Sequence, residues 1–245
     1  MKSLLAGLLV LLLPSGGMLP YADNGKDVSR QEPTVCRLAI DVEKDGVIDF
    51  YGTCVVVKCA EKEYTVLTAS HCVSSKDGLY EAGSLIVQFF IPDAKNVIYR
   101  TRVLEIPVKQ ILCINSAIDV AALAIEPNLS LSILGPIKSA SISVDGLAHG
   151  RKVHAIGCPM GGGLVVTEGY VAYREEEGQC FCTANIYKGN SGGAVVDADT
   201  KKLIGISVGV RADSSGFMPM PITYLQVFVP MDLIIPWLQD NKISL

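Results

Sequence analysis

Short apolar runs rich in β-branched residues recur along the chain from residue 35 onward, and turn residues separate them. Each run has the length of one strand, which favours many short strands over long helices. The runs cover residues 37–42, 47–50, 54–58, 64–69, 84–91, 97–106, 119–125, 152–157, 164–173, 180–185, 194–197, 202–210 and 224–229. Between the first two, Asp45-Gly46 predicts a tight two-residue hairpin. About a dozen strands of this kind predict an all-β sandwich or barrel.

The strand pattern is interrupted once and ends in a helix. Residues 127–150, rich in Ser, Pro and Gly, predict a connector that divides the strands into two groups of similar size. A convincing helical period appears only in residues 231–240, whose apolar residues fall on one face. We therefore predict a first strand domain over 35–126, a second over 151–230, and a helix with a short tail over 231–245.

The chain begins with a segment typical of an exported protein. An uninterrupted apolar run from Leu4 to Leu13 follows one positive charge and ends at a Pro-Ser-Gly-Gly break. About ten apolar residues are too few to cross the ~30 Å hydrocarbon core of a bilayer as a helix. The layout predicts a signal peptide over 1–22, cleaved near Gly17 to Ala22, before an extension over 23–34. An uncleaved anchor is the alternative. We expect a secreted or periplasmic protein without stable membrane association.

Composition argues against several classes of protein. The chain has 21 Lys and Arg against 25 Asp and Glu, with 49% hydrophobic and 19% charged residues. This is too apolar for a disordered chain, and without a basic run no nucleic-acid partner is expected. Eight Cys in an exported chain permit disulfides. The chain has only three His, and Cys180-Phe-Cys182 lacks the spacing of a metal knuckle, so no metal or other cofactor is expected.

Three segments carry residues suited to nucleophilic catalysis. His71 follows the apolar run 64–69, and Asp119 leads into the apolar run that follows it. Ser191 lies in the glycine-rich turn 189–193, where backbone N–H groups can point outward together. Each segment alone is commonplace, so only their combination carries weight.

In the order His, Asp, Ser, these segments resemble the active-site motifs of the chymotrypsin-like serine proteases. Thr68-Ala-Ser-His-Cys72 is similar to the family's TAAHC segment, and Gly189-Asn-Ser-Gly-Gly193 to its GDSGG segment. Asp119-Val-Ala-Ala-Leu123 is similar to its Asp-[Ile/Leu]-Ala-Leu segment, with one residue extra. The resemblance covers roughly residues 35–240. It implies an all-β chain of two six-stranded Greek-key β-barrels with a short C-terminal helix. It also implies a serine endopeptidase that hydrolyses proteins or peptides without a cofactor.

Within this family the chain is more similar to the HtrA/Deg branch. Asn190 stands where typical digestive members carry the Asp that receives the new N-terminal amine on zymogen activation. An Asn cannot supply the negative charge of that ion pair, so we expect activity without such a cleavage. The segments Ala155–Gly161 and Val166–Val171 also resemble this branch. No PDZ domain is expected after the closing helix.

The resemblance implies a role for each catalytic residue. Ser191 is the nucleophile, His71 the general base, and Asp119 the group that orients the imidazole. The backbone N–H groups of Gly189 and Ser191 form the oxyanion hole.

Two other histidines are alternative bases. His149 lies in the predicted connector and His154 inside an apolar run. We expect both to be structural, because neither belongs to a matching motif.

Substrate contacts are assigned by position in the family. Asn185, six residues before Ser191, is expected near the floor of the primary specificity pocket. The strand around Ser207 and Gly209 is expected to line that pocket and pair with substrate backbone. A neutral Asn185 disfavours basic specificity, because it gives no ion pair to Arg or Lys.

The resemblance also suggests cysteine pairings. Cys72 follows the catalytic His at a position that is often in a disulfide, with Cys54 or Cys59 as its partner. Other pairings are Cys158 with Cys180 or Cys182, and Cys36 with Cys113. Free thiols are the alternative, because HtrA-like domains generally lack disulfides.

Two other functions remain open at the level of sequence. One is a catalytically silent binding module with the same fold. The other is a protease of the viral type, whose substrate is its own precursor or a polyprotein.

Overall fold

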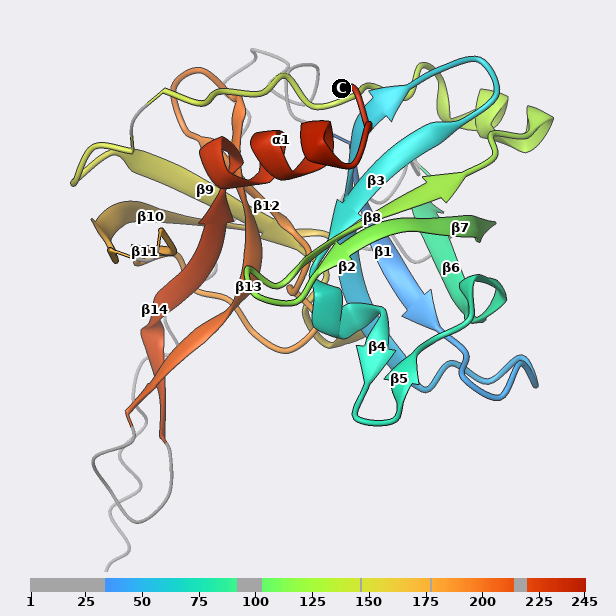
Figure 1. Cartoon of the computed structure of the whole chain (residues 1–245), viewed down its shortest axis with the longest axis horizontal. Helices are drawn as coiled ribbons and strands as arrows, with labels where there is room; N and C mark the ends of the chain where they lie inside the picture. Colours follow the sequence, from blue (N-terminus) through green and yellow to red (C-terminus); the bar gives the residue numbers. More distant parts are fainter. Residues whose placement is uncertain (1–33, 92–102, 146, 177, 214–219) are drawn as a thin grey trace, which may run out of the picture. The chain divides into compact units, whose positions relative to one another are not determined.

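Two closed barrels, each of six antiparallel strands, contain most of the described chain (Figure 1). The computed structural model describes residues 34–91, 103–145, 147–176, 178–213 and 220–245. The predicted signal peptide, and all but the last residue of the predicted extension, lie outside these ranges. Within them, no helix is both long enough and apolar enough to cross a membrane.

The first barrel is coloured blue to green in Figure 1. Its strands follow the order β1-β2-β3-β8-β7-β6, and β6 closes the barrel by pairing with β1. Leu38, Cys54, Val66 and Leu123 come from four of these strands and are fully buried in its core. The strands are β1 (Val35–Ile40), β2 (Phe50–Cys59), β3 (Tyr64–Thr68), β6 (Leu85–Phe90), β7 (Val103–Asn115) and β8 (Val120–Ile125).

The second barrel, coloured yellow to red, repeats the same strand order. Its order is β10-β11-β14-β13-β12-β9. Counted along the chain, the fourth strand of each barrel pairs with the first: β6 with β1, and β12 with β9. Val153, Ile204 and Phe228 are buried inside it. The strands are β9 (Lys152–Gly157), β10 (Val165–Arg174), β11 (Cys180–Cys182), β12 (Ala194–Asp197), β13 (Leu203–Asp213) and β14 (Met220–Pro230).

Short elements connect and close the barrels. Pro230 ends β14 and is the N-cap of helix α1 (Met231–Asp240), which buries Met231, Ile234 and Leu238 and contacts β13 and β14. The prediction of two six-stranded barrels with a short C-terminal helix is confirmed. The other elements are the two-stranded sheet of β4 (Ser74–Ser75) and β5 (Gly78–Leu79), and the 3-10 turns η2 (Ser70–Cys72), η3 (Ala82–Ser84), η4 (Leu129–Leu134) and η5 (Pro159–Gly161).

The tight hairpin predicted at Asp45-Gly46 is wrong. Strand β1 ends at Ile40 and pairs there with Phe50, so a longer loop over 41–49 joins the strands. The carboxylate of the buried Asp41 accepts hydrogen bonds from the N–H groups of residues 45 and 46, at 3.2 and 2.9 Å. These bonds satisfy loop N–H groups that a hairpin ladder would otherwise use.

Several other predicted strand boundaries also differ from the structure, and of the predicted run 47–50 only Phe50 lies in a strand, β2. The predicted run 97–106 begins in residues outside the described ranges, and its strand β7 continues to Asn115. The predicted run 180–185 is a strand only as far as Cys182.

All eight cysteines are free thiols in the structure, so none of the suggested pairings is formed. Cys54 lies opposite Cys36 in the β1–β2 register, and both are fully buried. The thiol of Cys72 points instead toward the second barrel, where its Sγ lies 3.7 Å from the backbone oxygen of Ser191.

Candidate active site

A hydrogen-bonded pair of His71 and Asp119 lies where β3 ends and β8 begins. The Nδ1 atom of His71 is 2.8 Å from Asp119 Oδ2, and the backbone N–H of His71 donates to Oδ1 at 3.0 Å. The hydroxyl of Ser70 donates to the same Oδ1 at 2.6 Å. Asp119 has φ 59°, a left-handed conformation that Asp tolerates better than most residues. These contacts fix the carboxylate and hold the imidazole with Nδ1 toward it.

The electrostatics of this pair favour a charged imidazole. The hydrogen bond to Asp119 raises the pKa of His71 well above its ordinary value, against the lowering effect of partial burial. Burial acts to raise the pKa of Asp119, but the hydrogen bonds from His71 and Ser70 outweigh it, so the net pKa is lowered. The carboxylate therefore stabilises the imidazolium that forms when His71 accepts a proton.

The two shifts make a prediction about titration. Asp119 stabilises the protonated ring, so we expect His71 to titrate above pH 6.5 and Asp119→Asn to lower its pKa toward that value. Burial lowers the pKa of His154, so it should titrate below 6.5 in the same sample. NMR of the histidine ring resonances against pH measures both. A His71 pKa at or below that of His154 would contradict the assignment.

Ser191 lies in a turn in which backbone carbonyl groups accept hydrogen bonds that fix the orientation of their peptide groups. The backbone oxygen of Lys188 accepts from Met160 N–H at 2.7 Å, and that of Asn190 accepts from Gly193 N–H at 2.9 Å. In a trans peptide the N–H points away from the C=O. The N–H groups of Gly189 and Ser191 therefore face away from these carbonyl groups. Within the described ranges, neither N–H group donates a hydrogen bond.

Strand β2 brings this turn against the first barrel. The N–H of Thr53 donates to the backbone oxygen of Ser191 at 2.8 Å. A Cβ atom at Gly52 would lie 2.8 Å from the thiol of Cys72 and 3.4 Å from that same oxygen. Cys72, the residue after His71, and Ser191 of the other barrel thus meet beside Gly52 of β2.

His71 and Ser191 are both accessible to solvent. The side chain of His71 is 49% exposed, and Ser191 is half-buried. No hydrogen bond between the His71 ring and the hydroxyl of Ser191 occurs in the described part of the chain. Such bonds are often long without a substrate and shorten only in the substrate complex.

The residues predicted to bind substrate lie in the second barrel. The backbone of Ser207 pairs with the glycine turn, accepting from Gly192 N–H at 2.7 Å and donating to the oxygen of Gly193 at 2.9 Å. Its buried hydroxyl has no partner among the described residues. Gly209 is half-buried on the same strand. Asn185 is exposed, and its backbone oxygen accepts from Thr167 Oγ1 at 2.7 Å.

Sequence reasoning missed two residues that support this arrangement. Ser70 stands where the matching family motif has Ala, and that difference was a signal that could have identified it. Thr53 gave no such signal, because its partners are far away in the sequence.

The rival histidines lie in other surroundings. His154 is buried in β9, with the carboxylate of Glu168 3.6 Å from its Nε2. His149 Nδ1 contacts the backbone oxygen of Ala172. No described contact joins either histidine to Ser191.

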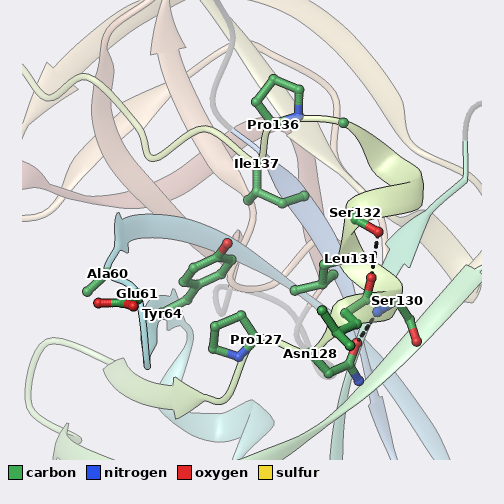
Figure 2. A pocket seen from close by; sticks show the side chains of 12 residues that line it. Ala60, Glu61, Tyr64, Pro127, Asn128, Ser130, Leu131, Ser132, Pro136 and Ile137 are labelled. Carbon is green, nitrogen blue, oxygen red and sulfur yellow. Dashed lines mark hydrogen bonds between the residues drawn. The ribbon is translucent and has the colours of Figure 1, made fainter.

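A surface pocket of the first barrel lies away from this site. Figure 2 shows Tyr64, Leu131 and Ile137 lining it beside the η4 turn, which Asn128 caps by accepting from Ser130 N–H at 3.0 Å. Tyr64 begins β3, whereas His71 follows its other end. The pocket is therefore separate from the His71–Asp119 pair.

Residues 52–206 match the family model of the trypsin-like peptidase domain. The chain belongs to this family. The matched residues include the His71–Asp119 pair and the turn that carries Ser191, and the predicted family is thereby confirmed. A comparison with curated protein sequences gives no significant match.

Solved structures with the same fold agree with this family. The peptidase domain is 20% identical to the serine endoprotease from Yersinia pestis, with a TM-score of 0.62, over 87% of this chain and 64% of that one. It is 25% identical to the HtrA-type protease AlgW with tripeptide, with a TM-score of 0.62, over 87% of this chain and 61% of that one. The chain thus spans a little over three fifths of these structures, and the HtrA-type likeness predicted from the motifs is confirmed.

Proposed function

We propose that this chain is an exported serine endopeptidase that uses Ser191, His71 and Asp119 and forms an acyl-enzyme. One observation carries the proposal. The imidazole of His71 is held at 2.8 Å by the carboxylate of Asp119, and the next residue, Cys72, contacts the turn of Ser191. Among the described residues, the N–H groups of Gly189 and Ser191 in that turn donate no hydrogen bond. Membership of the trypsin-like peptidase family supports the same reaction.

The mechanism follows from the chemistry of these groups. A serine hydroxyl is a poor nucleophile unless a base takes its proton as the new bond forms. His71 accepts that proton from Ser191 and then donates it to the leaving amine. Asp119 holds the ring and stabilises the imidazolium. Water then attacks the acyl carbon as His71 takes its proton, and the bond to Ser191 Oγ breaks as His71 returns that proton to the serine oxygen.

The turn supplies the second part of catalysis. The tetrahedral intermediate carries a negative oxygen, and in this proposal the N–H groups of Gly189 and Ser191 donate hydrogen bonds to it. Donors fixed before the reaction need no reorganisation when the charge develops. The hydrogen-bonded carbonyls of Lys188 and Asn190 supply that rigidity.

The substrate class is a protein or peptide. AlgW has been solved with a tripeptide, which supports a peptide substrate for a chain of the same fold. We assign substrate contacts to Ser207 and Gly209, next to the glycine turn. Asn185 is neutral and so offers no ion pair to a basic substrate side chain.

Activation by a new N-terminal amine is not required in this proposal. Asn190 is buried, and its Oδ1 has no hydrogen-bond partner among the described residues. A neutral amide at this place gives no carboxylate for an ammonium group to pair with. The oxyanion turn is instead held by hydrogen bonds from β2 and residue 160.

Export rests on the N-terminal sequence. One positive charge, the apolar run from Leu4 to Leu13 and the break that follows have the layout of a signal peptide. We assign the processed protein to the periplasm or the exterior.

Labelling with a fluorophosphonate tests the proposed activity. The serine oxygen displaces fluoride from phosphorus, and we expect mass spectrometry to find the single adduct on Ser191 of the purified, folded chain. Ser191→Ala is the negative control. Incubation with a peptide mixture should give cleavage at internal bonds. A folded chain that neither reacts nor cleaves would favour the binding-module alternative.

A further inference from the structure

We propose that Thr53, on β2, is the positioning residue that holds the oxyanion turn in its working conformation and ties it to the segment of His71. The inference rests on the proposed function, because it concerns the turn that carries Ser191. Thr53 touches no reacting atom in the proposed mechanism, and it would act only through the backbone of that turn.

Every polar atom of Thr53 is used. The residue is fully buried. Its hydroxyl donates to the backbone oxygen of Gly189 at 2.6 Å and accepts from the N–H of Cys158 at 2.9 Å. Its N–H donates to the backbone oxygen of Ser191 at 2.8 Å, and its own oxygen accepts from Thr68 Oγ1 at 2.7 Å. This one residue on β2 therefore joins three other segments, those of Thr68, Cys158 and Gly189, that are far apart in sequence.

The hydroxyl acts on the central peptide of the turn. That peptide joins Gly189 to Asn190, and it is held at both ends, because its oxygen accepts from Thr53 and its N–H donates to Tyr187 O at 3.0 Å. It lies between the two peptides that carry the N–H groups of Gly189 and Ser191. A rotation of the central peptide would change the directions of both N–H groups.

Gly189 makes this restraint necessary. Its φ of 96° lies in a region that is open to glycine, and glycine moves between backbone conformations more readily than other residues. Without the hydroxyl, its partly buried carbonyl would lose a protein partner and could gain another by turning. The restraint must therefore come from outside the turn, and Thr53 supplies it.

The same residue connects the turn with the segment of His71. Thr68 lies three residues before His71, and its hydroxyl holds the carbonyl of Thr53. A chain of hydrogen bonds thus runs from Thr68 through Thr53 to Gly189, across the two barrels. It fixes the turn relative to the end of β3, three residues before His71.

Two conservative substitutions separate the effect of the hydroxyl group from the effect of the side chain's volume. Thr53→Val keeps the shape and removes both hydrogen bonds of the hydroxyl, whereas Thr53→Ser keeps the hydroxyl and removes the methyl group. Thr65→Val is the matched control, because Thr65 is also buried on a neighbouring strand. Among the described residues the side chain of Thr65 makes no hydrogen bond, and it lines a small surface pocket.

The experiment measures the inactivation rate constant and the binding constant of a fluorophosphonate for each folded variant, with thermal unfolding alongside. Thr53→Val is expected to lower the rate constant about 10- to 100-fold and leave the binding constant nearly unchanged. The reason is that an N–H group that has turned away stabilises the charged transition state less. Thr53→Ser should recover most of this loss. Thr65→Val should leave both constants unchanged.

Each outcome decides the inference. If folded Thr53→Val reacts as fast as the parent, Thr53 does not position the turn. If Thr53→Val does not fold, Thr53→Ser decides: near-parental reaction supports the role of the hydroxyl, and a folded but unreactive Thr53→Ser overturns it. A parent chain that does not react at Ser191 overturns the proposed function itself, and the inference with it.

Discussion

Replacing His71 with Ala is expected to lower kcat for peptide cleavage by about a million-fold, the scale found when a serine protease loses its general base. Without the imidazole, nothing near Ser191 can take the hydroxyl proton as the bond to carbon forms. The residual rate would come from substrate binding and from the N–H donors of the turn. Initial rates on a peptide identified from the cleavage mixture, with active protein counted by fluorophosphonate titration of the parent, give the ratio.

His154→Ala is the matched control for this experiment. His154 is a buried histidine of the other barrel, and its ring is near Glu168 rather than the glycine turn. We expect folded His154→Ala to retain the kcat of the parent. If it is as inactive as His71→Ala, the base has been assigned to the wrong histidine.

Replacing Gly189 with Ala should lower kcat by at least about 10²- to 10³-fold, the cost of losing one oxyanion donor. The residue has φ 96°, and an added Cβ would lie 2.5 Å from the oxygen of Cys158 and 2.9 Å from the nitrogen of Met160. Both neighbours are backbone atoms, so the turn itself must move. Its movement displaces the N–H groups that are proposed to bind the oxyanion.

Gly46→Ala separates this effect from the general cost of a left-handed alanine. Gly46 has φ 87°, close to that of Gly189, but an added Cβ would meet no atom within 4 Å. We expect it to lower the free energy of unfolding by about 1 kcal/mol and leave kcat unchanged. Thermal unfolding and initial rates test both variants. A Gly189→Ala protein with the kcat of the parent would show that the turn is not the oxyanion site.

Several elements could be predicted from sequence because their signals are local. Strands β9 and β12 and helix α1 begin and end at the predicted residues 152–157, 194–197 and 231–240. In each, the spacing of apolar residues is enough to predict the element, because that spacing places them on the face that is buried. The common strand order of the two barrels has no such local signal.

Loops and cysteines were predicted less well for a physical reason. The turn type at Asp45-Gly46 depends on the carboxylate of Asp41, whose side chain takes up the loop N–H groups. Cysteine pairing depends on which face of a strand each thiol occupies. Cys54 faces Cys36 across the β1–β2 ladder, whereas Cys72 approaches the turn of Ser191.

The order of His71, Asp119 and Ser191, each in a recognisable motif, was enough to determine the family from sequence. A motif consists of residues that are neighbours in the sequence, so it can be identified without knowledge of the fold. Only the tertiary structure showed that Ser70 donates to Asp119 and that Thr53 ties the glycine turn to the first barrel. Thr53 and Gly189 are 136 residues apart, and their hydrogen bond exists only because the folding of two barrels brings β2 against that turn.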